Sequence, residues 1–222
     1  MAVIVIDTCL AACQVGVADG AAQLASASEP MERGHQERLA PMAAEVMARA
    51  GLAFGELSRI AVTIGPGSFT GLRVGLAFAK GLRLAWGAPL VGIGTLAALA
   101  ETVVNDGPVA ALIDARRGHV YVQAFDAGRA LTEPSVLPLA EAAAMLSGLA
   151  DWPFPVAGPG AGLIERMAGA ARIAEIAAPS LDALTRLADR AASAEHVGPL
   201  YLRPPDARPP NARPPNARPT SP

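Results

Sequence analysis

A glycine-rich turn near the middle of the chain separates a short apolar run from a long run of small residues. Residues 60–64 are expected to form a buried strand, residues 76–86 a helix, and residues 65–75 the turn between them. Glycines let the backbone approach another group closely, and a helix N-terminus offers free N–H groups. The sequence therefore favours an α/β fold in which this turn serves either a ligand or a partner.

Three familiar motifs do not fit this turn. A P-loop needs Gly-Lys-Ser/Thr, but Leu and Arg follow Gly71. A dinucleotide fingerprint that starts at Gly65 needs a third glycine at position 70, which is Thr70. A nucleophile elbow has the pattern Gly-x-Ser-x-Gly, but here Ser68 directly follows a glycine. Ser68 or Thr70 is instead expected to cap the following helix.

Small residues recur on one face of that helix. Gly71, Gly75 and Ala79 are spaced four apart, so they lie on one face and allow close approach of another segment. That segment belongs either to a partner or to this chain, and the pattern leaves both alternatives open.

Composition is that of a soluble α/β protein. The chain has 222 residues, 52% of them hydrophobic and 17% charged, with a net charge of −2. This length supports a sizeable core, and the charge gives no bulk electrostatic case for nucleic-acid binding. No apolar run is long enough for a membrane span, so we expect a cytoplasmic location and no membrane partner. Cys9 and Cys13 are expected to be small buried side chains.

The chain opens with a strand, an aspartate turn and a meander. Residues 3–6 and 12–17 are expected to be strands, and Asp19-Gly20 predicts a hairpin to a third strand over 23–28. This opening is typical of the actin-like, sugar-kinase-like ATPase (ASKHA) fold, in which the turn aspartate lies near phosphate or metal. Asp7 takes that role or only caps local N–H groups.

The opening recurs in the second half of the chain. A strand over 109–113, a turn beginning at Asp114 and a strand over 120–125 repeat it. The duplication predicts an α/β, two-lobed actin-like fold with a duplicated mixed sheet and helices. A second glycine turn, with Gly158 and Gly160, precedes another helix, so Asp7, Asp114, Gly158 and Gly160 are interpreted as vestigial nucleotide-like turns.

Helices are expected on both lobes. Residues 35–50 have an amphipathic helical pattern with Leu39, Met42 and Val46 on one face. Pro41 lies inside this helix and is expected to kink it or shift its start, and Gly51 is expected to end it. Further helices are predicted over residues 96–104 after a Thr95 cap, 139–150, 163–168, and 181–194 after a Ser180 cap.

The predicted organisation has three parts. Residues 1–105 form an N-terminal, partner-binding lobe and residues 106–203 a C-terminal lobe. Residues 204–222 repeat Pro-Pro-Asp/Asn-Ala-Arg and are expected to be a disordered extension. Its spaced arginines could be attracted to RNA phosphate.

Several of these segments resemble one family. Val5-Ile6-Asp7-Thr8, the run from Gly65 to Arg73, the run from Ile113 to Tyr121 and the closing Pro199-Leu200-Tyr201-Leu202-Arg203 are similar to the bacterial TsaB (YeaZ) family. The resemblance covers residues 1 to about 203 and leaves the tail out.

The resemblance implies a non-catalytic scaffold in the machinery that places threonylcarbamoyl on N6 of adenosine 37 in ANN-decoding tRNAs. The implied partners are the catalytic paralogue TsaD, the ATPase TsaE and, when the protein is alone, a second copy; tRNA is reached through the complex. No cofactor is expected to bind tightly, since ATP is used through the partner subunits. Helices over about 35–50 and 70–86 would form the partner interface.

Candidate site residues follow from this resemblance. The interface candidates are Leu39, Met42, Val46, Gly71, Leu72, Arg73, Val74, Gly75, Phe78 and Ala79. The loop that supports them structurally comprises Gly65, Pro66, Gly67, Ser68, Phe69 and Thr70.

Residue types also favour a non-catalytic role. Where the catalytic paralogue has an H-x-x-x-H metal pair, this chain has Thr95 and Leu99. His35, His119 and His196 are far apart, so no metal site is expected; His35 should start a helix and His119 should be exposed in a turn. The alternatives are an ATP-dependent phosphotransferase of the sugar-kinase-like type and, least favoured, a glycoprotease-like peptidase.

Overall fold

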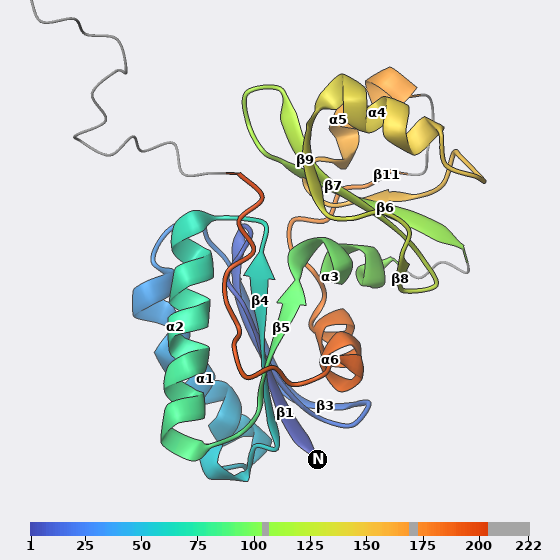
Figure 1. Cartoon of the computed structure of the whole chain (residues 1–222). Coiled ribbons are helices and arrows are strands. Elements are labelled where there is room, and N and C mark those ends of the chain that lie inside the picture. Colours follow the sequence, from blue (N-terminus) through green and yellow to red (C-terminus); the bar gives the residue numbers. More distant parts are fainter. Residues whose placement is uncertain (104–106, 169–172, 204–222) are drawn as a thin grey trace, which may run out of the picture.

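The chain folds into two mixed α/β lobes. The computed structural model describes residues 1–103, 107–168 and 173–203 (Figure 1). The strands are β1 (Ala2–Asp7), β2 (Ala12–Asp19), β3 (Ala22–Pro30), β4 (Arg59–Gly65), β5 (Leu90–Gly94), β6 (Pro108–Asp114), β7 (His119–Asp126), β8 (Arg129–Ala130), β9 (Ser135–Pro138), β10 (Val156–Ala157) and β11 (Ile173–Ala174). The helices are α1 (His35–Ala50), the 3₁₀ helix η1 (Phe54–Glu56), α2 (Phe69–Trp86), α3 (Thr95–Thr102), α4 (Leu139–Ser147), α5 (Ala161–Ala168) and α6 (Leu181–Arg190).

The first lobe is built on a five-stranded sheet in the order β3-β2-β1-β4-β5. The strands β1, β2 and β3 pair antiparallel as a meander, and β4 and β5 join β1 in parallel. The first three strands and their Asp19-Gly20 hairpin are therefore where the sequence predicts them. Parallel pairing sets the carboxyl ends of β1, β4 and β5 at one edge of the sheet, which is the edge nearest the second lobe (Figure 1).

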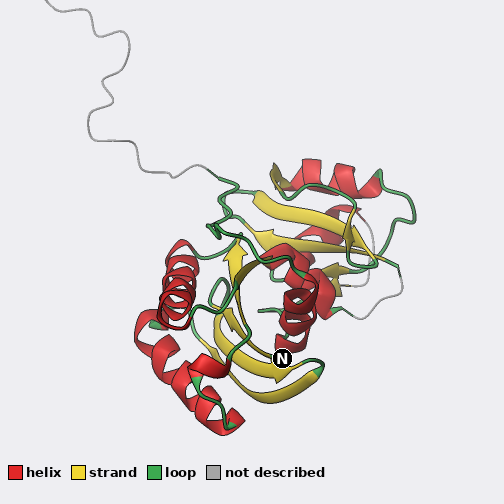
Figure 2. Ribbon diagram, turned by 60° about the horizontal axis from the view of Figure 1, so that its bottom comes forward, coloured by secondary structure: helices red, strands yellow, loops and turns green. Residues whose placement is uncertain are grey.

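Side chains of β1 alternate between the two faces of this sheet, as strand geometry requires. Ile4 and Ile6 face a core that α1 and α2 complete, while Val3 and Val5 face α6 on the other side. The helices thus cover both faces of the sheet (Figure 2). This double burial explains why β1 is a continuous apolar run.

The second lobe repeats the plan on a sheet in the order β11-β10-β6-β7-β8, with β9 paired to β7. Here β6 and β7 pair antiparallel as β1 and β2 do. The helices α4 and α5 cover one face, and α3 packs on the other through Leu96, Leu99 and Ala100. Because α3 also contacts the first lobe through Ala98, it joins the cores of the two lobes. The α/β prediction with two mixed sheets is confirmed.

The C-terminal part of the described chain returns to the first lobe. Leu184 and Ala188 of α6 pack with Val3 and Val5 of β1. Residues 197–203, which we call the C-terminal strap, continue along β4, where Leu200 donates its N–H to the carbonyl of Ile64 (2.7 Å). Residues 181–203 are thus adjacent to the first sheet, although the proposed lobe 106–203 groups them with the second. The division at 105 stays a prediction, and the tail 204–222 lies outside the described residues.

Every predicted helix is present, but several ends differ from the prediction. The helix α2 already begins at Phe69, so residues 69–75 are helical and not part of the turn, α5 begins at Ala161, and α3 ends at Thr102. Three further corrections concern one cap and two helix ends. Gly51 ends α1 in a left-handed conformation, and α1 runs through Pro41 with its start unshifted at His35. The first correction is that Gly94, not Thr95, is the N-cap of α3. The second is that α4 ends at Ser147, where Gly148 is its C-cap. The third is that α6 ends at Arg190, because the backbone turns extended at the next residue.

None of the helices within the described ranges has the length and apolar character that crossing a membrane requires.

Candidate functional site

The predicted glycine turn is locked onto the first turn of the chain. Ser68 caps α2, as predicted, by accepting a hydrogen bond from the N–H of Gly71 (3.3 Å). Ser68 also donates its own N–H to the carbonyl of Cys9 (2.7 Å), and Thr8 Oγ1 donates to the carbonyl of Gly71 (2.7 Å). A methyl group added at Gly67 would overlap the Cys9 carbonyl oxygen. The turn therefore holds the first β-hairpin against the N-terminus of α2.

The small-residue stripe of α2 faces this chain and not a partner. A methyl group at Gly71 would overlap the Thr8 carbonyl oxygen, and one at Gly75 would lie 2.5 Å from Thr8 Oγ1. Ala79, one turn further along, is fully buried in the first core. This corrects the assignment of Gly71, Gly75 and Ala79 to a partner interface: the alternative of packing within the chain holds for this stripe.

Burial divides the remaining interface candidates into two groups. Leu39, Met42, Val46 and Leu72 are at most 2% exposed, because their side chains fill the space between the helices and the sheet. A partner could not contact them broadly without opening the core. By contrast, Arg73 is exposed, and Val74 and Phe78 are half-buried. These three residues remain candidates for direct contact.

The accessible candidates line a groove between α1 and α2. Its volume is about 500 Å³, and its wall is largely apolar. The lining residues are Gln36, Leu39, Ala40, Phe69, Thr70, Arg73, Val74, Ala77 and Phe78. Sequence reasoning missed Gln36, Ala40 and Ala77 as part of this surface, and it took Phe69 and Thr70 only as loop support. The 3.6-residue period could have placed Ala77 beside Arg73 and Val74.

Two aromatic rings and a guanidinium meet at the end of the groove where α2 begins. The Arg73 guanidinium carbon lies 3.7 Å from the centre of the Phe69 ring, and Arg73 Nε donates to the Tyr201 hydroxyl (3.0 Å). The rings of Phe69 and Tyr201 are 5.7 Å apart. Since Tyr201 belongs to the strap, a residue distant in sequence completes this cluster.

The cleft between the lobes brings the predicted turns together. It has a volume of about 540 Å³. The lining residues are Cys9, Leu10, Ala11, Glu32, Gly67, Ser68, Ile113, Asp114, Ala115, Arg116, Tyr121 and Pro159. Pro159 stands between Gly158 and Gly160, and a methyl group at Gly160 would lie 2.9 Å from the Asp114 N atom. The second glycine turn is thus packed onto the end of β6, as the first is onto the end of β1.

The two turn aspartates have different surroundings. Asp7 is fully buried and does not line the cleft; its carboxylate accepts hydrogen bonds from Cys9 N (3.0 Å), Thr63 Oγ1 (2.6 Å) and Gln14 Nε2 (3.3 Å). Burial raises the pKa of Asp7, and these hydrogen bonds oppose the rise. Asp114 is exposed and accepts a turn hydrogen bond from Arg116 N (2.7 Å). The reading of Asp7 as a cap of local backbone holds, and its role as a nucleotide-like turn stays a prediction.

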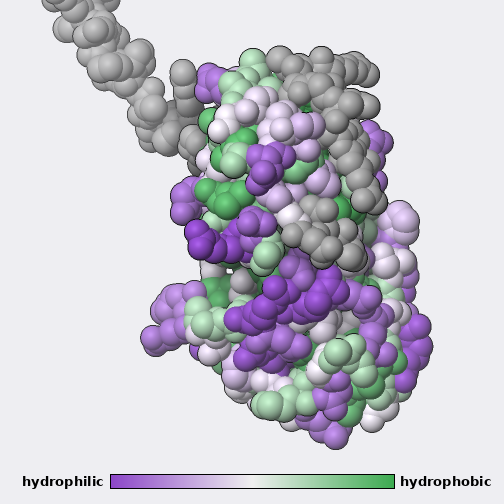
Figure 3. All heavy atoms as spheres, turned by 90° about the vertical axis from the view of Figure 1, so that its right-hand side faces the viewer, coloured by the Kyte–Doolittle hydropathy of each residue, from purple (hydrophilic) through white to green (hydrophobic). Residues whose placement is uncertain are grey.

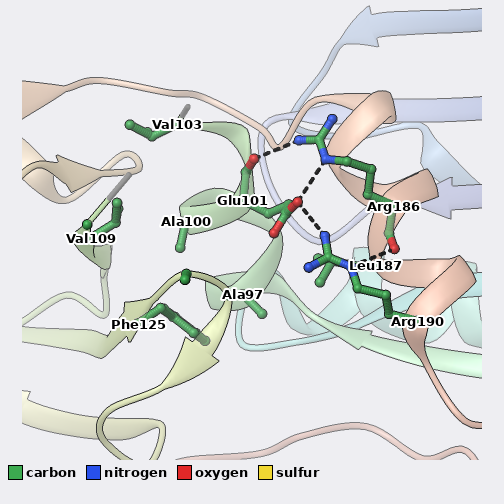
Figure 4. Close-up of a pocket in the computed structure, with 12 residues that line it drawn as sticks. Ala97, Ala100, Glu101, Val103, Val109, Phe125, Arg186, Leu187 and Arg190 are labelled. Carbon is green, nitrogen blue, oxygen red and sulfur yellow. Dashed lines mark hydrogen bonds and ion pairs between the residues drawn. The ribbon is translucent and has the colours of Figure 1, made fainter. Parts of the chain in front are cut away.

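A third cavity lies beside α3, the helix that contacts the cores of both lobes. It occupies about 360 Å³ between α3, α6, the strands β6 and β7, and the turn at Ala127 and Gly128 that follows β7 (Figure 4). Glu101 accepts hydrogen bonds from Arg186 Nε (2.8 Å) and Arg190 Nη2 (2.5 Å) at its rim. These contacts fasten α6 to α3. Hydrophilic side chains gather across the middle of this face of the molecule (Figure 3).

Histidine and cysteine positions agree only in part with expectation. His35 begins α1 and is buried, and Cys9 and Cys13 are free and buried, as predicted. Burial raises the pKa of the Cys9 thiol to about 12, so it is not a poised nucleophile. His119 is half-buried instead of exposed, because Nδ1 turns back to the Arg117 carbonyl (2.9 Å). Among the described residues, no group of three or more His, Cys, Asp or Glu side chains could hold a metal ion.

Comparison with known proteins identifies the family. The family model "TsaD: tRNA N6-adenosine threonylcarbamoyltransferase" matches residues 28–195. The structure titled YeaZ from Pseudomonas aeruginosa superposes with a TM-score of 0.78 at 30% identity, covering 90% of this chain and 99% of that one. The chain belongs to the TsaB (YeaZ) family. The tRNA threonylcarbamoyladenosine biosynthesis protein TsaB of Escherichia coli is 35% identical over 125 residues, 54% of this chain and 53% of that protein.

The sequence alignment with TsaB covers a smaller share of the chain than the structural superpositions do. The chain's alignment spans about half the length of the curated TsaB relative. Ethanolamine utilization protein EutJ of Carboxydothermus hydrogenoformans, with a TM-score of 0.50 at 16% identity, covers 85% of this chain and 89% of EutJ and shares the fold alone. The prediction of a two-lobed actin-like, ASKHA-type fold is confirmed.

Proposed function

We propose that this TsaB-family chain is a non-catalytic scaffold subunit of the machinery that installs threonylcarbamoyl on N6 of adenosine 37 in ANN-decoding tRNAs. In this proposal it binds the catalytic subunit TsaD through the α1–α2 groove and works alongside the ATPase TsaE. When TsaD is absent, the same groove would pair two copies of this chain. The tRNA would be reached through the complex.

The observation that carries the proposal is the groove itself. It exposes apolar side chains beside an aromatic–arginine cluster, although the core beneath it is already complete. Phe69 is 50% exposed at its end. Aromatic and arginine side chains around an apolar centre are the composition of protein–protein interfaces, where they contribute most of the binding energy. A second subunit is therefore a better occupant than a small molecule.

Residue chemistry supports a non-catalytic role. Thr95 and Leu99 occupy the positions that the resemblance assigns to the metal pair of TsaD, and both side chains are fully buried. A threonine hydroxyl and a leucine do not replace two imidazoles as ligands of a transition metal. In this proposal the chemistry takes place on TsaD.

A groove variant tests the binding surface. Ala77→Arg places a long charged side chain in the groove at an exposed position of α2, so it should leave the fold intact and weaken TsaD binding by about tenfold or more. Leu84→Arg is the matched control, since Leu84 is 89% exposed on the same helix and does not line the groove. Titration calorimetry of purified proteins measures both affinities, and equal affinities of wild type and Ala77→Arg for TsaD would refute the groove as the interface.

Depletion tests the biological role. Loss of this protein should reduce threonylcarbamoyladenosine in digested tRNA, measured by mass spectrometry of nucleosides, and wild-type protein should restore it. Unchanged threonylcarbamoyladenosine after depletion would refute the assignment.

A phosphotransferase remains the second candidate, because the interlobe cleft gathers the turns that bind nucleotide in the sugar-kinase-like fold. The first turn opposes this reading, because it contributes Cys9, Leu10 and Ala11, which offer no hydroxyl or basic group for phosphate; the hydroxyl and basic groups of the lining, on Ser68, Arg116 and Tyr121, come from other segments. Tight ATP binding and substrate-dependent ATP turnover by the isolated protein would establish it, and their absence would leave the scaffold.

A further inference from the structure

We propose that Arg73, held between Phe69 and the strap residue Tyr201, recognises a carboxylate side chain on the partner subunit. This inference rests on the proposed function and adds to it the chemistry of the contact. It also makes Tyr201 a positioning residue, acting through the Arg73 guanidinium.

The first step is that Arg73 is oriented but not neutralised. Its guanidinium carbon lies over the Phe69 ring, and among the described residues its hydrogen bonding is limited to Nε, which donates to the Tyr201 hydroxyl. Within the described part of the chain, no carboxylate forms an ion pair with it. The two Nη groups therefore keep their donors for an outside acceptor, and a guanidinium matches a carboxylate in a bidentate manner.

Arg38 of α1 shows the contrasting case in the same lobe. It is paired with Glu29 (2.6 Å) and Glu45 (2.8 Å), so its donors are used within the chain. Arg73, in contrast, is held by aromatic groups that fix its direction and leave its charge available. Pre-organisation of this kind reduces the entropy lost when an interface forms.

The C-terminal strap holds Tyr201 in place without any partner. Leu200 is hydrogen-bonded to the end of β4, and Arg203 Nη1 donates to the Ala115 carbonyl of the second lobe (2.8 Å). The strap thus spans both lobes with Tyr201 between its anchors, and Tyr201 remains 46% exposed. The cluster joins the groove through Phe69 and Arg73, which line it. The partner should present an acidic side chain beside apolar residues that fill the groove.

Binding of TsaD to conservative variants tests the proposal. Arg73→Lys keeps the charge and loses the planar fork, so the Kd should rise about tenfold. Tyr201→Phe removes only the hydroxyl, and the Kd should rise about threefold or more. The double variant should bind no worse than Arg73→Lys alone, since Tyr201 acts through Arg73. The Kd of wild type should rise with salt more steeply than that of Arg73→Gln.

Lys80→Gln is the matched control for charge. Lys80 is exposed on α2 two turns beyond Arg73 and outside the cluster, so its loss should change the Kd less than about twofold. Melting temperatures check that every variant is folded, and Phe69→Leu replaces Tyr201→Phe if that variant is not. If wild type does not bind TsaD, the proposed function fails. If wild type binds and both Arg73→Lys and Tyr201→Phe bind equally well, or Lys80→Gln weakens binding as much as Arg73→Lys, this inference alone is overturned.

Discussion

The first and second β-hairpins share one plan and use their turn aspartates differently. In both, the first strand of an antiparallel hairpin ends in aspartate, and a glycine turn before a helix packs onto that end. Asp7 is fully buried under three hydrogen-bond donors, whereas Asp114 is exposed at the cleft, where it accepts a turn hydrogen bond from Arg116 N. The same position is thus part of the core in one lobe and part of the surface in the other.

The difference follows from what covers each turn. The first is covered by the Gly67–Ser68 segment and the N-terminus of α2, which approach to hydrogen-bond distance. Both turns contribute residues to the cleft between the lobes, but Asp114 itself lines the cleft and Asp7 does not. Burial makes the first turn a structural element that supports the α1–α2 groove, while the second turn keeps access to solvent. This contrast predicts unequal responses to substitution.

The largest effect is expected at the contact that buries the first turn. Gly71→Ala would force a methyl group into the Thr8 carbonyl, and neither backbone can yield easily. We expect the free energy of unfolding to fall by about 3 kcal/mol or more. Urea denaturation followed by circular dichroism measures it.

The matched control lies on the same helix. Gly81 has nothing within 4 Å of an added methyl group, so Gly81→Ala should stabilise the protein by up to about 1 kcal/mol through helix propensity. Equal effects of the two substitutions would mean that α2 does not pack on Thr8 as described.

The next effect concerns the buried carboxylate. Asp7→Ala removes the acceptor of three donors, Cys9 N, Thr63 Oγ1 and Gln14 Nε2. Unpaired buried donors cost about 1–3 kcal/mol each, less where water enters, so we expect a loss of about 3 kcal/mol in the free energy of unfolding. A loss below about 1 kcal/mol would break the contrast between the hairpins, because that is the range expected of a surface position.

The sequence predicted the strands, the turns and the helix cap of this region, but not which residues they would contact in the folded chain. The apolar runs, the Asp19-Gly20 turn and the Ser68 cap are local signals, and each is confirmed. Whether Gly71 and Gly75 face a partner or Thr8 depends on a contact some 60 residues away in sequence, and spacing on a helix carries no such information. The same holds for Tyr201, which only the path of the strap brings to Arg73.

The pH dependence of stability should reveal the burial of Asp7 with a defined sign. Because burial raises its folded pKa above the unfolded value, the native state binds more protons between the two values. Wild-type stability from this group therefore falls as pH rises from about 4 through the folded pKa. Asp7→Asn does not titrate, so its stability relative to wild type should increase over that window, measured by urea denaturation across pH.

The contributions of other carboxylates to the pH dependence of stability are the same in wild type and Asp7→Asn, so they cancel in the comparison. Arg38 lowers the pKa of Glu29 and Glu45, so the stability they contribute is lost as pH falls, the opposite direction, and it is the same in both proteins. A difference between wild type and Asp7→Asn that is independent of pH would show that Asp7 is not desolvated.

The smallest effect is expected at the second turn. Asp114→Ala removes one exposed acceptor of the Arg116 N–H, and water can replace it, so the free energy of unfolding should fall by less than about 1 kcal/mol. The same denaturation experiment measures it beside Asp7→Ala. Because this substitution should leave the fold intact, it also tests the role of the carboxylate in the cleft. A change in ligand or partner binding by Asp114→Ala would then come from loss of the exposed carboxylate itself. A loss as large as that of Asp7→Ala would instead place both aspartates in equivalent structural roles, and the hairpins would then differ in exposure but not in function.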